Sequence, residues 1–162
     1  MTGLLHAICI SPAKGTAKRA VPNADLVHEH GLEGDAHAGP WHRQVSLLDQ
    51  ADIDTMTARG LELEQGAFGE NLIISGLDLS VVGTGSVLNV GDAVLEITQI
   101  GKKCHDRCAI YEAVGTCIMP KRGLFARVLK GGAVAPGAVV SIAALRRRTA
   151  ADLQHLNTGA SS

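Results

Sequence analysis

Aromatic side chains are scarce in this chain of 162 residues, of which only 2% are Phe, Trp or Tyr. Trp41 and Phe68 lie near glycine-bearing motifs, and Tyr111 and Phe125 flank the last cysteine. Rings grouped around polar motifs suit the wall of a pocket, although core packing remains the usual explanation for any single ring.

Long apolar runs and a charge of one sign are also missing. No apolar run is long enough to cross a bilayer, and the first residues lack the charged and apolar segments of a secretory signal. The formal net charge is -1 at pH 7, which gives the chain no overall preference for nucleic acid or acidic membranes. We therefore expect a cytoplasmic protein without nucleic-acid or membrane partners, in which any anion site is local.

Several catalytic motifs are absent as well. No glycine-rich phosphate loop precedes a predicted helix, and there is no nucleophile elbow of the hydrolase type. The chain has four cysteines, and three of them lie between residues 104 and 117 beside basic residues. Without a secretory signal, this grouping favours reduced thiols over a disulfide framework.

Short apolar segments separated by glycine turns predict a fold that is mainly β. Gly91-Asp92 and Pro136-Gly137 are turn signals, the first of them joining two predicted strands as a hairpin. Such a pattern, with nineteen glycines and few helices, is typical of a β-barrel or sandwich. The predicted strands cover residues 4–10, 24–28, 43–48, 72–75, 87–90, 93–100 and 138–142.

Only short helices are predicted. The first runs to Arg59, with Asp49 or Asp52 as its N-cap and Gly60 as its stop. A second is expected over residues 124–129. A third, around residues 150–156, lies close to the end of the chain.

Cys104 is the strongest candidate for chemistry. Lys102, Lys103 and Arg107 surround it in the sequence, and positive charge favours the thiolate, the form that attacks sulfur or binds a soft metal. Cys108 follows four residues later, so on a helix the two thiols would share one face. Two thiolates could then hold one soft atom, or one thiol could resolve a persulfide on the other.

A zinc site is the second interpretation of the same segment. Cys117 and His105 could complete a set of three sulfurs and one nitrogen around a metal. The spacing is against it, because zinc sites commonly use two tighter Cys-x2-Cys pairs. A buried hydrophobic role for Cys117 is as well supported as a functional one, and Cys9, within an apolar strand, is expected in the core.

Four segments, in order, carry a family resemblance. Three are Gly-Leu-Glu-Gly-Asp-Ala-His-Ala-Gly at 31–39, Arg-Gln-Val-Ser-Leu-Leu at 43–48 and Phe-Gly-Glu-Asn-Leu at 68–72; the fourth is the strand 95–99 that leads to Cys104. Together they resemble the MOSC domain, named for the C-terminal part of molybdenum cofactor sulfurases, over about residues 4–142. The resemblance implies a β-rich, barrel-like fold and a role in binding or handling the molybdenum cofactor or in transferring sulfur.

The chain departs from the common family pattern at the thiol. Ile100-Gly101 and Lys103-Cys104 stand where the family commonly has Pro-Arg and Pro-Cys. Cys108 and Cys117 are additional, as in a subgroup of stand-alone bacterial members. We expect one such domain over residues 1–145, followed at 146–162 by a basic and then polar tail that is partly disordered and solvated.

The resemblance implies a cofactor site made of several segments. In the turn at 34–39, glycine backbone can approach a ligand and His37 can donate to an anion; a purely structural turn is the alternative. Arg43 offers a planar fork suited to the phosphate of the pterin cofactor, or it pairs with Asp49 at the surface. The candidate cofactor-binding residues are Gly34, Asp35, His37, Arg43, Glu70, Asn71, Lys103 and Arg107, and the candidate metal ligands, taken from the grouping of the thiols, are Cys104, Cys108 and Cys117.

Glu70 and Asn71 have two interpretations of equal weight. They could orient the pterin ring by hydrogen bonds, or they could satisfy backbone groups where a strand begins.

We interpret the chain as a molybdenum cofactor (molybdopterin) binding protein in which Cys104 accepts sulfur as a persulfide or ligates the metal. The chain is too short for a pyridoxal phosphate domain, so we expect no such site and a cysteine desulfurase as sulfur donor. A molybdoenzyme would be the partner downstream, and a homodimer is left open. The alternatives are a cofactor-holding reductase of N-hydroxylated compounds and a zinc-binding or interaction module.

Overall fold

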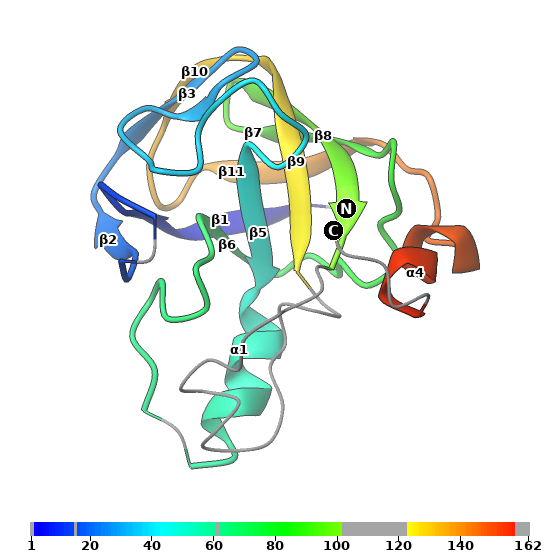
Figure 1. The fold of residues 1–162 in the computed structure, drawn as a ribbon, viewed down its shortest axis with the longest axis horizontal. Coiled ribbons are helices and arrows are strands. Elements are labelled where there is room, and N and C mark those ends of the chain that lie inside the picture. The colour runs from blue at the N-terminus through cyan, green and yellow to red at the C-terminus, as the bar shows by residue number, and fades with distance from the viewer. Residues whose placement is uncertain (1, 15, 61, 102–122, 158–162) are drawn as a thin grey trace.

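The computed structural model describes residues 2–14, 16–60, 62–101 and 123–157, and the side chains up to residue 153 (Figure 1). In this part of the chain seven strands close into a barrel, in the order β11-β7-β8-β9-β5-β6-β1, with β11 pairing back onto β1. Neighbouring barrel strands are antiparallel except for β5 and β6, which are parallel. They are β1 (Thr2–Ile10), β5 (Val45–Asp49), β6 (Leu72–Ser75), β7 (Val87–Val90), β8 (Ala93–Ile100), β9 (Leu124–Lys130) and β11 (Val139–Ala144).

Four further short strands lie outside the seven-stranded barrel. β2 (Arg19–Val21) pairs with the end of β1, and β3 (Ala24–Val27) lies between β4 (Gly31–Leu32) and β10 (Gly132–Val134) in a separate small sheet. The prediction of a mainly β, barrel-like fold with few short helices is confirmed. The Gly91-Asp92 hairpin is confirmed too, because Val90 pairs with Ala93 across it.

The interior of the barrel is apolar because strand residues alternate between its two sides. Along β8, Leu95 and Ile97 are buried inside while Glu96 is half-exposed on the outside. The same alternation in β9 puts Ala126 and Val128 in the interior cluster. The barrel wall therefore presents its polar side chains outward, where a site can form.

A second apolar cluster lies outside the barrel wall. It contains Leu48 of β5, Ile73 of β6 and Phe125 of β9, and α1 (Gln50–Thr57) packs Ile53 and Met56 onto them. The two buried helix residues are three positions apart and therefore share one face of α1. The side chain of Asp49 accepts a hydrogen bond from the backbone N–H of Ala51 at 3.0 Å, so the predicted N-cap is confirmed.

The predicted helix over residues 124–129 is wrong, because this segment forms β9. It pairs with β8 on one side and β5 on the other. Leu124, Ala126 and Val128 point into the barrel and Phe125 lies in the outer cluster, a period of two, while the short run of apolar residues also fits a helix face. Pairing with two distant strands decides the conformation here.

The C-terminal segment returns to the barrel. The expected short helix is confirmed as α4 (Ala150–Asn157), and Leu153 packs against the interior cluster. Arg146 and Arg147 are exposed as expected, but the guanidinium of Arg148 donates to the carbonyl oxygens of Val82 and Leu79. Arg148 is therefore a structural residue, and the domain boundary at residue 145 stays a prediction.

Among the helices that are described, none is long and apolar enough to span a membrane.

Candidate functional site

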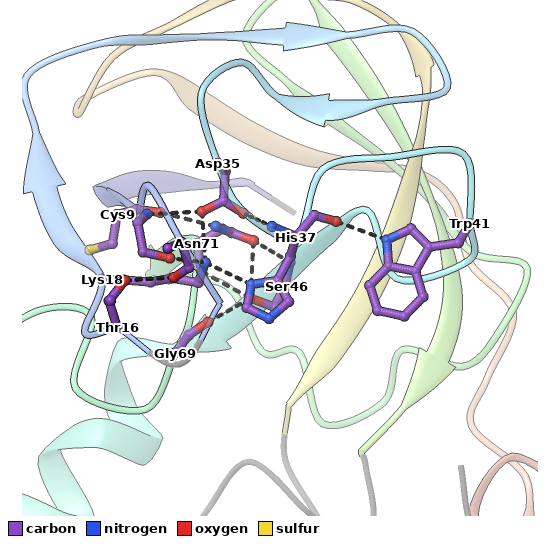
Figure 2. A network of polar contacts seen from close by, with 11 residues as sticks. Cys9, Thr16, Lys18, Asp35, His37, Trp41, Ser46, Gly69 and Asn71 are labelled. Carbon is purple, nitrogen blue, oxygen red and sulfur yellow. Dashed lines mark hydrogen bonds and ion pairs between the residues drawn. The ribbon is translucent and has the colours of Figure 1, made fainter.

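A buried ion pair anchors the turn at 34–39 to the barrel. Lys18 and Asp35 join at 2.7 Å between Nζ and Oδ1, and their side chains are 2% and 0% exposed. The same carboxylate oxygen accepts the backbone N–H of Ser11 at 3.0 Å, and the hydroxyl of Ser11 accepts from Lys18 at 3.2 Å. Figure 2 shows Lys18 and Asp35 at the centre of this polar network. Asp35 therefore holds the turn in place.

The protonation state of Asp35 reflects this surrounding. Burial alone would raise the pKa of its carboxyl, but the hydrogen bonds from Lys18 and from the Ser11 backbone, with the charge of Lys18, outweigh burial. The pKa of Asp35 consequently lies below its ordinary value, and the residue is a carboxylate at neutral pH.

His37 is fixed at three points. Its backbone N–H donates to Oδ2 of Asp35 at 3.2 Å, its ring Nδ1 lies 3.0 Å from Lys18 Nζ, and its carbonyl oxygen accepts the indole N–H of Trp41 at 2.8 Å. Gly34, which begins the turn, has φ of +84°, a conformation that glycine adopts without strain. The turn is thus rigidly held and carries a half-buried imidazole.

Glu70 and Asn71 bond to backbone groups. Glu70 accepts the N–H groups of Gly66 and Phe68, each at 3.0 Å. Asn71 accepts from the Ser46 backbone at 3.0 Å and donates to the carbonyl oxygen of Cys9 at 3.0 Å. These bonds favour the interpretation that both side chains satisfy backbone groups, and each residue is only 1% exposed.

Burial raises the pKa of both ionisable groups beside this network, Glu70 and Cys9. It raises the pKa of the Glu70 carboxyl, although three backbone N–H groups work against it. It also raises the pKa of the Cys9 thiol to about 12, with a further contribution from the nearby charge of Glu70. Cys9 is fully buried, as predicted, and remains a thiol at neutral pH.

Arg43 lies between two aromatic rings. Its guanidinium carbon is 4.8 Å from the ring centre of Trp41 and 5.6 Å from that of Phe125. Within the described residues its buried Nε has no hydrogen-bond partner, and the carboxylate of Asp49, the expected alternative partner, accepts the backbone N–H of Ala51 at the start of α1. Burial lowers the pKa of Arg43. A guanidinium in this position can accept an anionic ligand without breaking an ion pair to any of the described residues.

A second cation contacts the same indole. Lys14 Nζ lies 5.8 Å from the ring centre of Trp41. His42 also borders the area, with Nε2 2.9 Å from Oε1 of Gln99, and Gln99 pairs with Phe125 across β8 and β9. The aromatic ring of Trp41 thus concentrates positive charge at one place on a chain that is nearly neutral overall.

Gly101 and Gly123, the described residues on either side of the segment that contains Cys104, Cys108 and Cys117 (the thiol segment), lie close to Phe125 in the chain or the sheet. Ile100 pairs with Leu124, and the backbone N–H of Gly101 donates to the carbonyl oxygen of Gly123 at 2.6 Å. Phe125, two residues further, is the ring that Arg43 contacts. The predicted residues Lys103, Cys104, Arg107, Cys108 and Cys117 lie outside the described residues, so their proposed roles stay predictions.

Lys18 and Ser11 were missed by the sequence analysis. No motif includes them, and Lys18 is 17 residues away from the carboxylate it pairs with. A single lysine before a short strand has no signal that separates it from a solvated side chain. Only the fold brings these groups together.

A small cavity lies elsewhere, between α1 and the loop before β6. It measures about 190 Å³ and is lined partly by His6, Ile53 and Glu70. Ligand pockets are typically about 300 to 1,000 Å³, so this cavity is a poor candidate for a cofactor. In the described part of the chain no three His, Cys, Asp or Glu side chains are grouped so as to hold a metal ion.

Known structures share this fold. YuaD from Bacillus subtilis has a TM-score of 0.75 at 19% identity, covering 90% of this chain and 98% of YuaD. YiiM from Geobacillus stearothermophilus has a TM-score of 0.66 at 20% identity, covering 96% of this chain and 82% of YiiM. At these identities the likeness establishes the fold alone.

Sequence comparisons give the family. The uncharacterized protein YflK of Bacillus subtilis is 27% identical over 136 residues, which are 76% of this chain and 61% of YflK. The chain therefore spans about three fifths of the length of that relative. The family model of the MOSC domain matches residues 33–141, which include the turn, Arg43 and the start and end of the thiol segment. The chain belongs to the MOSC domain family, which is associated with the molybdenum cofactor.

Proposed function

We propose that this protein binds the molybdenum cofactor, or its molybdopterin precursor, and handles sulfur through Cys104. The observation that carries the proposal is Arg43, a guanidinium between two aromatic rings whose buried Nε has no partner among the described residues. Buried charges are normally paired. A half-buried guanidinium for which the described residues supply no anion fits a ligand that brings one.

The chemistry of Arg43 favours a phosphate. A guanidinium presents a planar fork of N–H groups that matches two phosphate oxygens, and the rings of Trp41 and Phe125 fix its plane. Lys14, at the same indole, adds a second positive charge. The turn at 34–39 supplies backbone and the imidazole of His37 close by, since the carbonyl oxygen of His37 accepts from Trp41.

Cys104 is the proposed sulfur acceptor. It follows Gly101 by three residues, and its basic neighbours in the sequence favour the thiolate. The thiolate attacks the outer sulfur of a persulfide on a donor desulfurase; a new S–S bond forms on Cys104, the donor's S–S bond breaks, and the donor leaves as a thiolate. Cys108 is proposed to resolve the persulfide or to share a metal. The bound cofactor would supply the metal centre that finally receives the sulfur.

The proposal is tested by what the protein carries when it is isolated from a host that makes the cofactor. Mass spectrometry should find molybdopterin or the complete cofactor, and the Arg43→Ala variant should carry much less. Zinc without pterin would favour the metal-binding module. Bound cofactor together with electron-donor-dependent turnover of an N-hydroxylated compound would favour the reductase.

The thiol assignment has its own test, alkylation rates measured across pH. Cys104 should react fastest, with a pKa below the roughly 8.5 of a free cysteine. Cys9 is the internal control, because burial raises its pKa to about 12 and it should be modified only on unfolding. If Cys104→Ser retains the fast-reacting thiol, Cys104 is not the acceptor.

A further inference from the structure

The ammonium group of Lys18 has three acceptors for its three protons. These are Oδ1 of Asp35 at 2.7 Å, Oγ of Ser11 at 3.2 Å and Nδ1 of His37 at 3.0 Å. Lys18 is 4% exposed, so the protein supplies its hydrogen-bond partners. An ammonium group donates and cannot accept.

This geometry determines the form of the His37 ring. Because Lys18 can only donate, Nδ1 of His37 must accept, and it cannot carry a proton while it does so. The proton of the neutral imidazole is then on Nε2. The backbone contacts of His37 to Asp35 and Trp41 hold the ring in place for this arrangement.

We propose that Lys18 is a positioning residue that keeps His37 as a neutral Nε2–H hydrogen-bond donor toward the anion bound at the adjacent site. The ligand role rests on the proposed function, whereas the form of the ring does not. Figure 2 shows the imidazole between Lys18 and the turn that leads to Trp41. The buried ammonium group of Lys18 thus selects which ring nitrogen of His37 carries the proton.

Two chemical consequences follow. His37 adds direction but no positive charge to the site, so the charge that attracts an anion comes from Arg43 and Lys14. A protonated Nε2 also cannot act as the base that removes a proton from a thiol. His37 therefore stabilises an acceptor by donation and leaves activation of the thiol to neighbouring cations.

The ring form is measured directly by ¹⁵N-detected two-bond correlation spectra of the histidine side chains, which separate the two neutral tautomers from the imidazolium. The signal of His37 is assigned by its loss in His37→Gln. At pH 7 the wild-type protein should show the Nε2–H tautomer. A dominant Nδ1–H tautomer or an imidazolium at His37 would overturn the proposal.

The role of Lys18 is then isolated. In Lys18→Met the His37 signal should shift toward a mixture of tautomers, while an unchanged Nε2–H signal would show that Lys18 does not position the ring. If this variant fails to fold, the wild-type protein still decides. Its Lys18 ammonium protons should be protected from exchange and should show a nuclear Overhauser contact with the His37 ring, and absence of that contact contradicts the proposal.

Binding of molybdopterin separates this inference from the proposed function. The amide of a glutamine can replace an Nε2–H donor, whereas that of an asparagine lies closer to the position of Nδ1. His37→Gln should therefore keep more affinity than His37→Asn, which should lose about tenfold to hundredfold, the range for a hydrogen bond to a charged group. The reverse order would overturn the donor role. No binding to the wild-type protein would defeat the proposed function and leave the tautomer result standing.

Discussion

Lys18 is a buried cation and Arg43 is a half-buried one, and the two differ in what surrounds them. Lys18 has a carboxylate, a hydroxyl and an imidazole nitrogen within hydrogen-bond distance, whereas Arg43 has two aromatic rings and a buried Nε without a partner among the described residues. His37 and Trp41 connect them. The comparison separates a charge that the fold needs from a charge that the fold leaves for a ligand.

Breaking the ion pair between Lys18 and Asp35 should have the largest effect on stability. Lys18→Met leaves the Asp35 carboxylate buried without its counter-ion, which typically costs about 3 to 5 kcal/mol of unfolding free energy. Denaturant titration measures this loss. The double variant Lys18→Met/Asp35→Leu should recover part of it, because no isolated charge is then left; a single variant as stable as the wild type would show that the ion pair is not structural.

Acid should reduce the contribution that the Asp35 carboxylate makes to folding stability, and it should do so over a defined pH range. Since the pKa of Asp35 lies below its ordinary value, its contribution is complete above the unfolded-state pKa of about 3.9 and is lost as pH falls through the folded-state pKa. Glu70 acts in the opposite direction: its raised pKa makes mild acidification stabilising down to about pH 4.3.

Unfolding free energies at pH 7, 5 and 3 measure both effects. Stability should be lost mainly below pH 4 in the wild type, and the loss should be shallower in Asp35→Asn. An equal loss in the two proteins would assign the acid sensitivity to other carboxyl groups.

Removing the positive charge of Arg43 should change the free energy of unfolding little. Arg43→Met gives up contacts with two rings, each worth on the order of 0.5 to 1 kcal/mol, but it also removes the cost of partly burying a charge for which the described residues supply no anion. The net change in unfolding free energy should lie within about 1 kcal/mol. A loss as large as that of Lys18→Met would mean that Arg43 is part of the structural framework.

Arg127 provides the smallest expected effect. Its guanidinium lies 2.7 Å from Glu96 and 3.2 Å from Glu29, and its side chain is 42% exposed. Exposed ion pairs contribute little and are screened by salt. Arg127→Gln should therefore change stability less than the removal of Lys18 or Arg43 does, and the difference should shrink in high salt. A salt-independent loss would show that the pair is effectively buried.

The fold was predictable where the signals are local. The Gly91-Asp92 turn fixes the β7–β8 hairpin, and Asp49 begins α1 because its side chain caps the helix. Residues 124–129 misled the prediction, since a short apolar run fits both a helix and a strand until β5 and β8 pair with it.

The site was predictable only through its motifs. Arg43 and His37 were found by family resemblance, and the structure adds the rings and bonds around them. Lys18 could not be found, because its three acceptors are brought together only by folding. The roles of Glu70 and Asn71 were undecided because hydrogen-bond partners depend on the distant segments that pack beside them.

The central claim is that Arg43, whose Nε has no hydrogen-bond partner among the described residues, binds the ligand's anion. The dissociation constant of molybdopterin tests this claim most directly. Arg43→Lys, which keeps the charge but loses the planar fork, should bind about tenfold to hundredfold more weakly than the wild type, and Arg43→Ala should bind no better. Arg127→Gln removes the same charge from a guanidinium that already has carboxylate partners, and it should bind like the wild type. Equal dissociation constants for the wild type, Arg43→Lys and Arg43→Ala would contradict the account.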